Sequence, residues 1–211
     1  MPIETSLLPV FLLAALLVIL TPGPDMIFIT ANTLGGGRKA GVVSMLGVAS
    51  GVYVHILAAT FGLSAIFAAS ELAYQVVRFA GAAYLAWIGW QFLTRKSSFG
   101  RIGAAGPAPL ATLYRRGILT NLLNPKAILF VSSFVPQFVV PEIGPVWVQM
   151  MTLGVILITL MILVDLPIIW AANRFGMAAG RYRGAGDLLS KIIGSLLISL
   201  AVYLAVARRQ S

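Results

Sequence analysis

Residue types that carry catalytic or metal chemistry are scarce in this sequence. Its 211 residues include no cysteine, one histidine and six acidic residues. The absence of cysteine excludes disulfides, thiol redox chemistry and thiolate metal sites. A single histidine excludes the H-E-x-x-H zinc site of metalloproteases, and the G-x-S-x-G turn of serine hydrolases does not occur. The sequence therefore predicts a protein that is not an enzyme and that binds no metal or other cofactor.

Charge is also scarce, and apolar residues dominate. Charged residues make up 10% of the chain and hydrophobic residues 59%, and the mean hydropathy is +0.96. Soluble domains carry about 25% charged residues, so this composition predicts a polytopic all-α membrane protein. The net charge of +9 does not indicate nucleic acid, because the basic residues fall in the gaps between apolar runs, where membrane proteins keep their cytoplasmic loops. Membrane lipid is the expected partner instead.

Six apolar runs are long enough, or nearly so, to cross a bilayer as helices. A spanning helix needs about 20 apolar residues, because unsatisfied backbone groups are costly in hydrocarbon. The expected spans are Leu7–Leu34, Gly41–Ala69, Leu72–Leu93, Gly117–Val140, Val146–Ala172 and Ile192–Ala207.

The basic residues predict the orientation of these spans. They cluster in residues 38–39, 95–116 and 174–191, which lie in alternate gaps, whereas residues 208–209 form a smaller basic pair at the other side. Because basic loops stay in the cytoplasm, we expect both termini to lie outside. The N-terminal segment lacks the positive region of a signal peptide, so we expect the first helix to be retained.

The longest gap divides the chain into two halves. Residues 95–116 are rich in Gly, Ala, Ser and Pro, which is typical of a flexible linker. Residues 1–94 and 117–211 each hold three expected spans, so the second half enters the membrane from the opposite side. We predict one transmembrane transporter domain over residues 1–211, built from two inverted three-helix repeats with broken first and fourth helices. Its glycine-rich helix faces are compatible with a homodimer.

The first apolar run is interrupted by Thr21-Pro22-Gly23-Pro24-Asp25. Each proline removes an amide donor and disfavours the helical conformation of the residue before it. We expect a first half-helix to end near Leu20 and a second to begin at Pro24. Non-helical backbone at membrane depth survives only where protein buries it or water lines it, and an intramembrane carboxylate is by default functional. The break therefore indicates a transport site.

The fourth run contains a second break, at Asn124-Pro125-Lys126. Asn124 is a good helix N-cap, and Pro125 suits the first helical position. Lys126 then lies near mid-bilayer at the positive end of a helix, where a cation is disfavoured, so we expect it to have a specific anionic partner. Asn121 lies beside this break and belongs to the same expected site.

We interpret the two breaks as one binding site for a zwitterionic amino acid. The substrate ammonium would lie near Asp25, and its carboxylate near Lys126 and the facing helix N-termini. Asp165 in the fifth run is the candidate proton carrier, with a third site carboxylate or a purely helix-bonding group as alternatives. A second hypothesis stays open, in which Asp25 and Lys126 form a structural ion pair in a carrier or channel for another small polar or cationic solute.

Two further features have structural interpretations. Gly47 and Gly51 form a small-xxx-small pair, which predicts close contact with another helix. His55 is alone in an apolar run, and we expect it to be packed and neutral.

Several short segments, spread over nearly the whole chain, also resemble segments of a known family. They are Thr21–Pro24, the glycine-spaced stretch from Gly41 to Gly51, Gly81–Gly89, Gly117–Asn121, Asn124–Lys126 and Ser133–Phe138. Together they resemble the LysE/RhtB amino-acid exporters. The resemblance implies efflux of amino acids or close derivatives across the bacterial inner membrane, coupled to the proton or membrane-potential gradient. Members differ in substrate, from basic amino acids to threonine and homoserine or branched-chain amino acids, and we expect a homoserine- or threonine-like substrate here.

Overall fold

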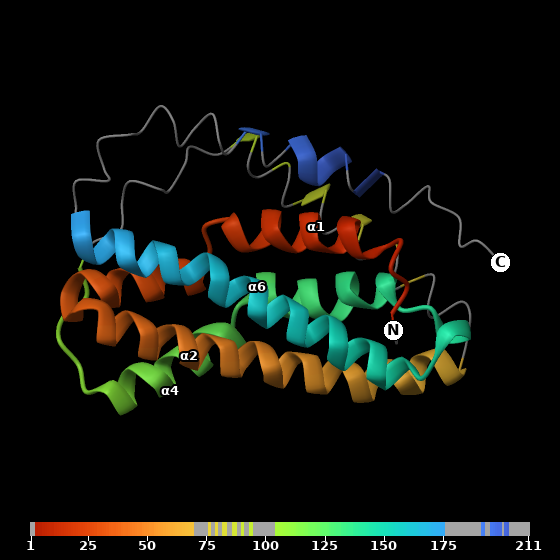
Figure 1. Ribbon diagram of the computed structural model, residues 1–211, viewed down its shortest axis with the longest axis horizontal. Helices are drawn as coiled ribbons and strands as arrows, with labels where there is room; N and C mark the ends of the chain where they lie inside the picture. The colour runs from red at the N-terminus through yellow and green to blue at the C-terminus, as the bar shows by residue number, and fades with distance from the viewer. Residues whose placement is uncertain are drawn as a thin grey trace.

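The computed structural model describes residues 3–69 and 104–175 without a gap, and short pieces elsewhere, at 76, 79, 82–83, 86–87, 90, 93–94, 191–192, 195–199 and 201–202. Every regular element in this described part is helical, as the composition predicts (Figure 1). The elements are α1 (Leu8–Leu20), α2 (Pro24–Ala69), α4 (Leu110–Leu122), α5 (Pro125–Leu129), the π-helical turn η1 (Phe130–Phe134), the 3₁₀ turns η2 (Val135–Phe138) and η3 (Pro141–Ile143), and α6 (Val146–Phe175).

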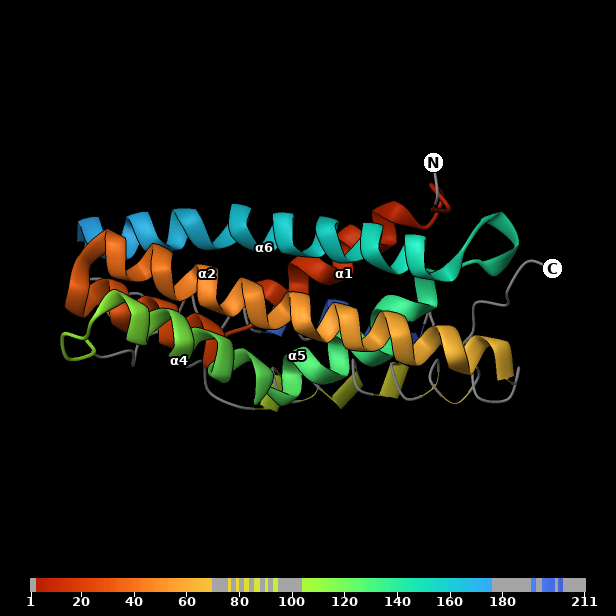
Figure 2. The same cartoon turned by 90° about the horizontal axis from the view of Figure 1, so that it is seen from below.

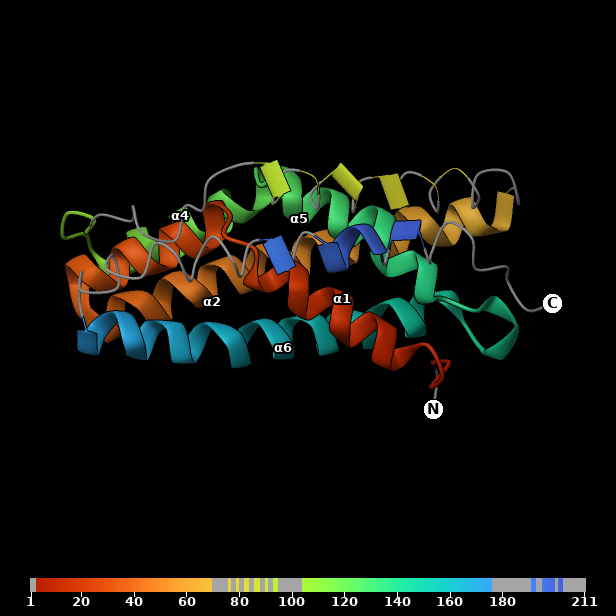
Figure 3. The same ribbon diagram turned by 90° about the horizontal axis from the view of Figure 1, so that it is seen from above.

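The first span is broken where the two prolines predict. α1 ends at Leu20 and α2 begins at Pro24, and the residues between them are not helical. The 13 residues of α1 measure about 20 Å, which is too short for a hydrocarbon core of about 30 Å. The first part of α2 continues in the direction of α1 (Figures 1 and 3), so the two half-helices form one interrupted path.

α2 reverses direction at Gly37. This residue has φ 74°, a left-handed conformation that favours glycine. A methyl group on Gly41 would collide with the Thr33 side chain, whereas a continuous helix would separate these two residues by about 12 Å. The Arg38 amide at the start of the returning limb donates to Asn173 Oδ1 of α6 at 3.1 Å. The two limbs of α2 therefore belong to the first and second expected spans.

The fourth span is bent at the second break. α4 meets the helical segment Pro125–Phe138, which comprises α5, η1 and η2, at an angle of 55°. Asn124 caps α5, since its Oδ1 accepts from the Lys126 amide at 3.0 Å, and Pro125 is the first helical residue. These are the roles that the sequence predicts for both residues.

α4 begins earlier than expected. Its first residue is Leu110, before the predicted start at Gly117 and inside the expected linker 95–116. The helix extends beyond the apolar run because Arg115 and Arg116 are exposed on it. A helix can continue past the edge of its apolar stretch when its charged side chains reach solvent.

α2 lies between α6 on one side and α4 with α5 on the other (Figures 2 and 3), and it packs most extensively against α4 and α6. Gly47 faces the α4 backbone at Tyr114, and Gly51 faces the Asn121 side chain. A methyl group on Gly117 would lie 2.7 Å from the Ser44 carbonyl oxygen. The close helix contact predicted from the two α2 glycines is confirmed.

α1 is fixed to η1 and η2 by four phenylalanines, Phe11, Phe130, Phe134 and Phe138. Phe11 and Phe134 are fully buried, and the ring centroids of the contacting pairs lie 4.6 to 6.2 Å apart. Aromatic pairs at these distances stabilise each other beyond the effect of burial alone. The cluster holds α1 beside the bent fourth span, and so places the two breaks near each other.

The described helices fit a membrane environment. Large apolar side chains are exposed on them, with Phe61 at 74% and Leu163 at 63% of their surface. Of the predicted spans, the third (Leu72–Leu93) and the sixth (Ile192–Ala207) lie largely outside the described residues. Within the described part, the helices long and apolar enough to cross a membrane are Pro24–Gly62, Val146–Arg174 and, taken as one bent span, Leu110–Leu122 with Pro125–Phe138. Pro24–Gly62 includes the reversal at Gly37, so its two limbs lie in different spans.

We expect Gly117→Ala to destabilise the protein, because the new methyl group meets the Ser44 carbonyl and the Val48 amide of α2 rather than a movable side chain. Overpacking of this kind costs about 1–3 kcal/mol. The matched control is Gly62→Ala on α2, which meets no described atom within 4 Å. Thermal unfolding of detergent-purified protein measures both variants, and equal melting temperatures would contradict the proposed contact.

Candidate functional site

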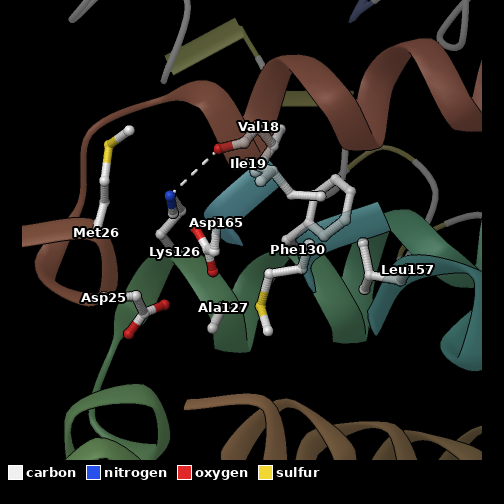
Figure 4. A pocket seen from close by; sticks show the side chains of 10 residues that line it. Val18, Ile19, Asp25, Met26, Lys126, Ala127, Phe130, Leu157 and Asp165 are labelled. Carbon is white, nitrogen blue, oxygen red and sulfur yellow. Dashed lines mark hydrogen bonds between the residues drawn. The ribbon is translucent and has the colours of Figure 1, made fainter. Parts of the chain in front are cut away.

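A cavity of about 60 Å³ lies where the two breaks approach each other (Figure 4). Its polar wall is formed by Asp25 of α2, Lys126 of α5 and Asp165 of α6. Phe130, Leu157 and Met161 are among the side chains of its apolar wall. The structure thus brings together the three charged residues that the sequence assigns to the site.

Asp25 is held by two asparagine side chains. Its Oδ2 accepts from Asn121 Nδ2 at 2.9 Å and from Asn124 Nδ2 at 2.7 Å. Both asparagines are almost completely buried. Asp25 also lies in the first turn of α2, where the helix dipole favours a negative charge. Its Oδ1 is buried without a hydrogen-bond partner in the described structure, so this oxygen keeps an unused acceptor capacity.

Asn121 connects Asp25 to the second limb of α2. The His55 ring nitrogen Nε2 lies 3.2 Å from the Asn121 carbonyl oxygen, and the absent side chain of Gly51 leaves room for the Asn121 amide. The sequence places Asn121 near the site without indicating these neighbours. Asn121 and Asn124 orient Asp25 through their hydrogen bonds, but they do not belong to the described lining of the cavity.

The Lys126 ammonium bonds to the C-terminal end of α1. Its Nζ donates to the Thr21 carbonyl at 2.9 Å and to the Val18 carbonyl at 3.2 Å. Within the described part of the chain, no direct salt bridge joins it to Asp25 or Asp165. The ammonium is thus bonded to the negative end of the α1 dipole, while Asp25 and Asp165 line the same cavity, and the predicted anionic partner stays a prediction.

Pro22 explains why these carbonyls accept a side chain. In an uninterrupted helix the amide of residue 22 would donate to the Val18 carbonyl, but proline has no amide hydrogen. The Thr21 amide donates to this carbonyl at 3.2 Å instead, and Lys126 is its second donor. Gly23 allows the lysine to approach, because a methyl group there would lie 3.0 Å from Lys126 Nζ. Pro22, Pro24 and Pro125 shape the breaks and are not among the described residues around the cavity.

Thr21 contributes its backbone rather than its hydroxyl. The Thr21 Oγ1 donates to the Leu17 carbonyl at 2.8 Å, and the residue is only 3% exposed. The side chain therefore stabilises the last turn of α1, while the carbonyl faces Lys126.

Asp165 is buried on α6, with 6% of its surface exposed, and lies beside Lys126 in Figure 4. It precedes Pro167, which interrupts the hydrogen bonding of α6 by leaving the Leu163 carbonyl without an amide donor. This third weakened helix is not among the sequence predictions. A proline close to an intramembrane carboxylate is the signal that identifies it.

The family model described as LysE type translocator matches residues 16–208 of the chain. The chain belongs to this family. The resemblance seen in its short segments is thus confirmed. The translocator is also similar to the homoserine/homoserine lactone efflux protein of Salmonella typhimurium, with 32% identity over 94% of this chain and 95% of that protein. It shares 35% identity with the leucine efflux protein of Enterobacter sp. strain 638, over 61% of this chain and 62% of that protein.

No solved structure matches the translocator significantly. Family membership and the apolar helices make it a membrane-embedded transport protein. The cavity is therefore the candidate binding site.

A paired substitution tests the bond between Asn124 and Asp25. Asn124→Asp keeps the cap on α5 but places a second carboxylate against Asp25, so we expect a loss of about 1–3 kcal/mol. Adding Asp25→Asn returns an amide donor to the pair and is expected to recover part of that loss. The melting temperatures of both single variants and the double variant measure the coupling, and strictly additive effects would show that the two side chains do not interact.

Proposed function

We propose that this translocator exports small amino acids, homoserine- or threonine-like or related, across the bacterial inner membrane. The observation that carries the proposal is the cavity between two helix breaks, lined by two carboxylates and an ammonium. Discontinuous helices at mid-membrane are where secondary transporters bind their substrates. A zwitterionic amino acid presents the opposite charges to these side chains. No catalytic step is part of the proposal.

Asp25 would attract the substrate ammonium, and Lys126 its carboxylate. Thr21, Gly23, Asn121 and Asn124 support these two groups, as do the prolines of the breaks, Pro22, Pro24 and Pro125. Ligand pockets measure about 300–1,000 Å³, so a cavity of about 60 Å³ must enlarge to hold an amino acid. Rocking of one half of the protein against the other would supply that space and expose the site to each side in turn.

Two inverted three-helix halves would form the complete transporter, with both termini outside. The two broken spans run in opposite directions (Figures 1 and 3), which supports this arrangement. The exposed apolar side chains of α2 and α6 suit contact with lipid acyl chains or with a second copy in a homodimer.

The names of the relatives bear on which part of the substrate is recognised. One relative is named for both homoserine and homoserine lactone. These two compounds share a primary ammonium, but the lactone has no free carboxylate. Recognition of the ammonium is therefore the requirement that both compounds can meet, which supports a central part for the carboxylate of Asp25.

Asp165 is the proposed proton carrier. It is buried, it lines the cavity, and it lies on a helix weakened by Pro167. Each charge that moves inward across 100 mV supplies about 2.3 kcal/mol, which corresponds to about a fifty-fold concentration ratio. Exchange of one proton for one amino acid would therefore drive substantial export.

The direct test is export from cells loaded with dipeptides that are hydrolysed inside, with and without the translocator, across a panel of small amino acids. Faster appearance of one amino acid, or of a small set, in the medium is the expected result. No difference across the panel would overturn the proposal and favour a carrier for another small polar or cationic solute.

Asp25→Asn is expected to abolish this export while folded protein stays in the membrane, because the amide no longer attracts an ammonium. Glu142→Gln, which neutralises an exposed carboxylate in η3, is the matched control and should export normally. Full export by the Asp25→Asn variant would show that Asp25 does not bind the substrate.

Asp165→Asn is expected to separate binding from coupling. Proteoliposomes carrying this variant should still exchange labelled for unlabelled substrate at equal concentrations, because exchange needs no net proton movement. They should fail to accumulate substrate when a proton gradient is imposed. Gradient-driven accumulation at the wild-type level would show that the proton travels through another group.

A further inference from the structure

The last turn of α1 presents carbonyl oxygens that lack the amide donor a continuous helix would supply. Helical bonds join each carbonyl to the amide four residues later. For Val18 and Leu20 those later residues are Pro22 and Pro24, which have no amide hydrogen. The two prolines therefore do more than interrupt the helix. They leave the Val18 carbonyl with a single 3.2 Å hydrogen bond from the Thr21 amide, so it can accept a second donor at the negative end of the α1 dipole.

These acceptors hold a primary ammonium in the structure. Lys126 Nζ donates to the carbonyls of Val18 and Thr21, and an ammonium has three hydrogens to donate. The same cavity is lined by the carboxylates of Asp25 and Asp165. Asp25 Oδ1 is buried and has no partner in the described part of the chain. Carbonyl oxygens surrounded by carboxylates are the ligand set that recognises an R–NH₃⁺ group.

We propose that the carbonyls of Val18 and Thr21, with the carboxylates of Asp25 and Asp165, form a subsite for the substrate ammonium, which the Lys126 ammonium occupies in the structure. The inference rests on the proposed function and identifies how the same site is kept closed. A substrate amino acid carries the same primary ammonium group, but as a free molecule. Its ammonium takes the place of Lys126 Nζ at the α1 carbonyls. The displaced Lys126 then becomes available to the substrate carboxylate.

The small cavity agrees with this exchange. While Lys126 reaches across to α1, the remaining space is about 60 Å³, far below the size of a ligand pocket. Gly23 contributes to this arrangement, because a methyl group there would lie only 3.0 Å from Lys126 Nζ. Lys126 thus closes the site with an internal copy of the group that the site binds.

The test measures binding of n-propylammonium, which carries the ammonium alone, to the detergent-purified full chain. A tethered group competes at an effective concentration in the millimolar range, so its removal should tighten binding of this probe by about tenfold or more. We expect this gain in Lys126→Met, which keeps an apolar stem without the charge. Lys126→Arg keeps a cation in place and should show no gain. Lys39→Met makes the same change at an exposed position of α2 and is the matched control.

Unchanged or weaker propylammonium binding by Lys126→Met would overturn the proposal. If Lys126→Met is unstable when purified alone, added propylammonium should restore its folded yield by replacing the missing ammonium at the α1 carbonyls. Failure of that rescue, with folded Lys126→Arg as the reference, would equally overturn it. Binding is measured without transport, so a negative export panel would refute the proposed function and leave the ammonium subsite to be judged by this experiment.

Discussion

The interaction on which the site depends is the bond between a lysine ammonium and the open end of a helix. Lys126 belongs to α5, and its position near the N-terminus of that helix is electrostatically unfavourable. It is stabilised by reaching the opposite kind of helix end, the carbonyl terminus of α1. The contact ties the two broken spans together at their breaks.

Asp25 is also stabilised by a helix end, but by the positive N-terminal end of α2. It begins α2, where a carboxylate is favoured, and two buried asparagine amides bond to one of its oxygens. The two opposite charges thus stay in one cavity without a direct contact between them in the described structure. Each is stabilised by backbone or amide dipoles, so neither neutralises the other. A charged pair kept apart in this way leaves room for a ligand that carries both charges.

The positions of the breaks could be predicted from the sequence because they follow from local chemistry. Proline has no amide hydrogen wherever it stands, so the ends of α1 and α2 and the cap at Asn124 are properties of a few neighbouring residues. The charged residues of the site could also be predicted, because a titratable group in an apolar run is rare and costly. Asp25, Lys126 and Asp165 indeed line one cavity.

The contacts of these residues could not be predicted, because they depend on distances across the fold. The sequence indicates that Lys126 needs an anionic partner but does not show that its ammonium bonds to backbone carbonyls of α1. The bonds from Asn121 and Asn124 to Asp25 depend on how α4 meets α2, which the glycine contacts determine. The start of α4 at Leu110 was missed because apolar content marks the membrane-embedded part of a helix and not its end.

The turn at Gly37 has a mechanical consequence for the site. α2 reverses there without an intervening loop, so its short first limb, which begins with Asp25, is joined directly to its long second limb. α1 is joined to this first limb through the non-helical residues between Leu20 and Pro24. Asp25 therefore belongs to α2, whereas the carbonyls that hold Lys126 belong to α1. Any change of angle at these non-helical residues would change the distance between the two parts of the site, and so alter its size and its charge balance together.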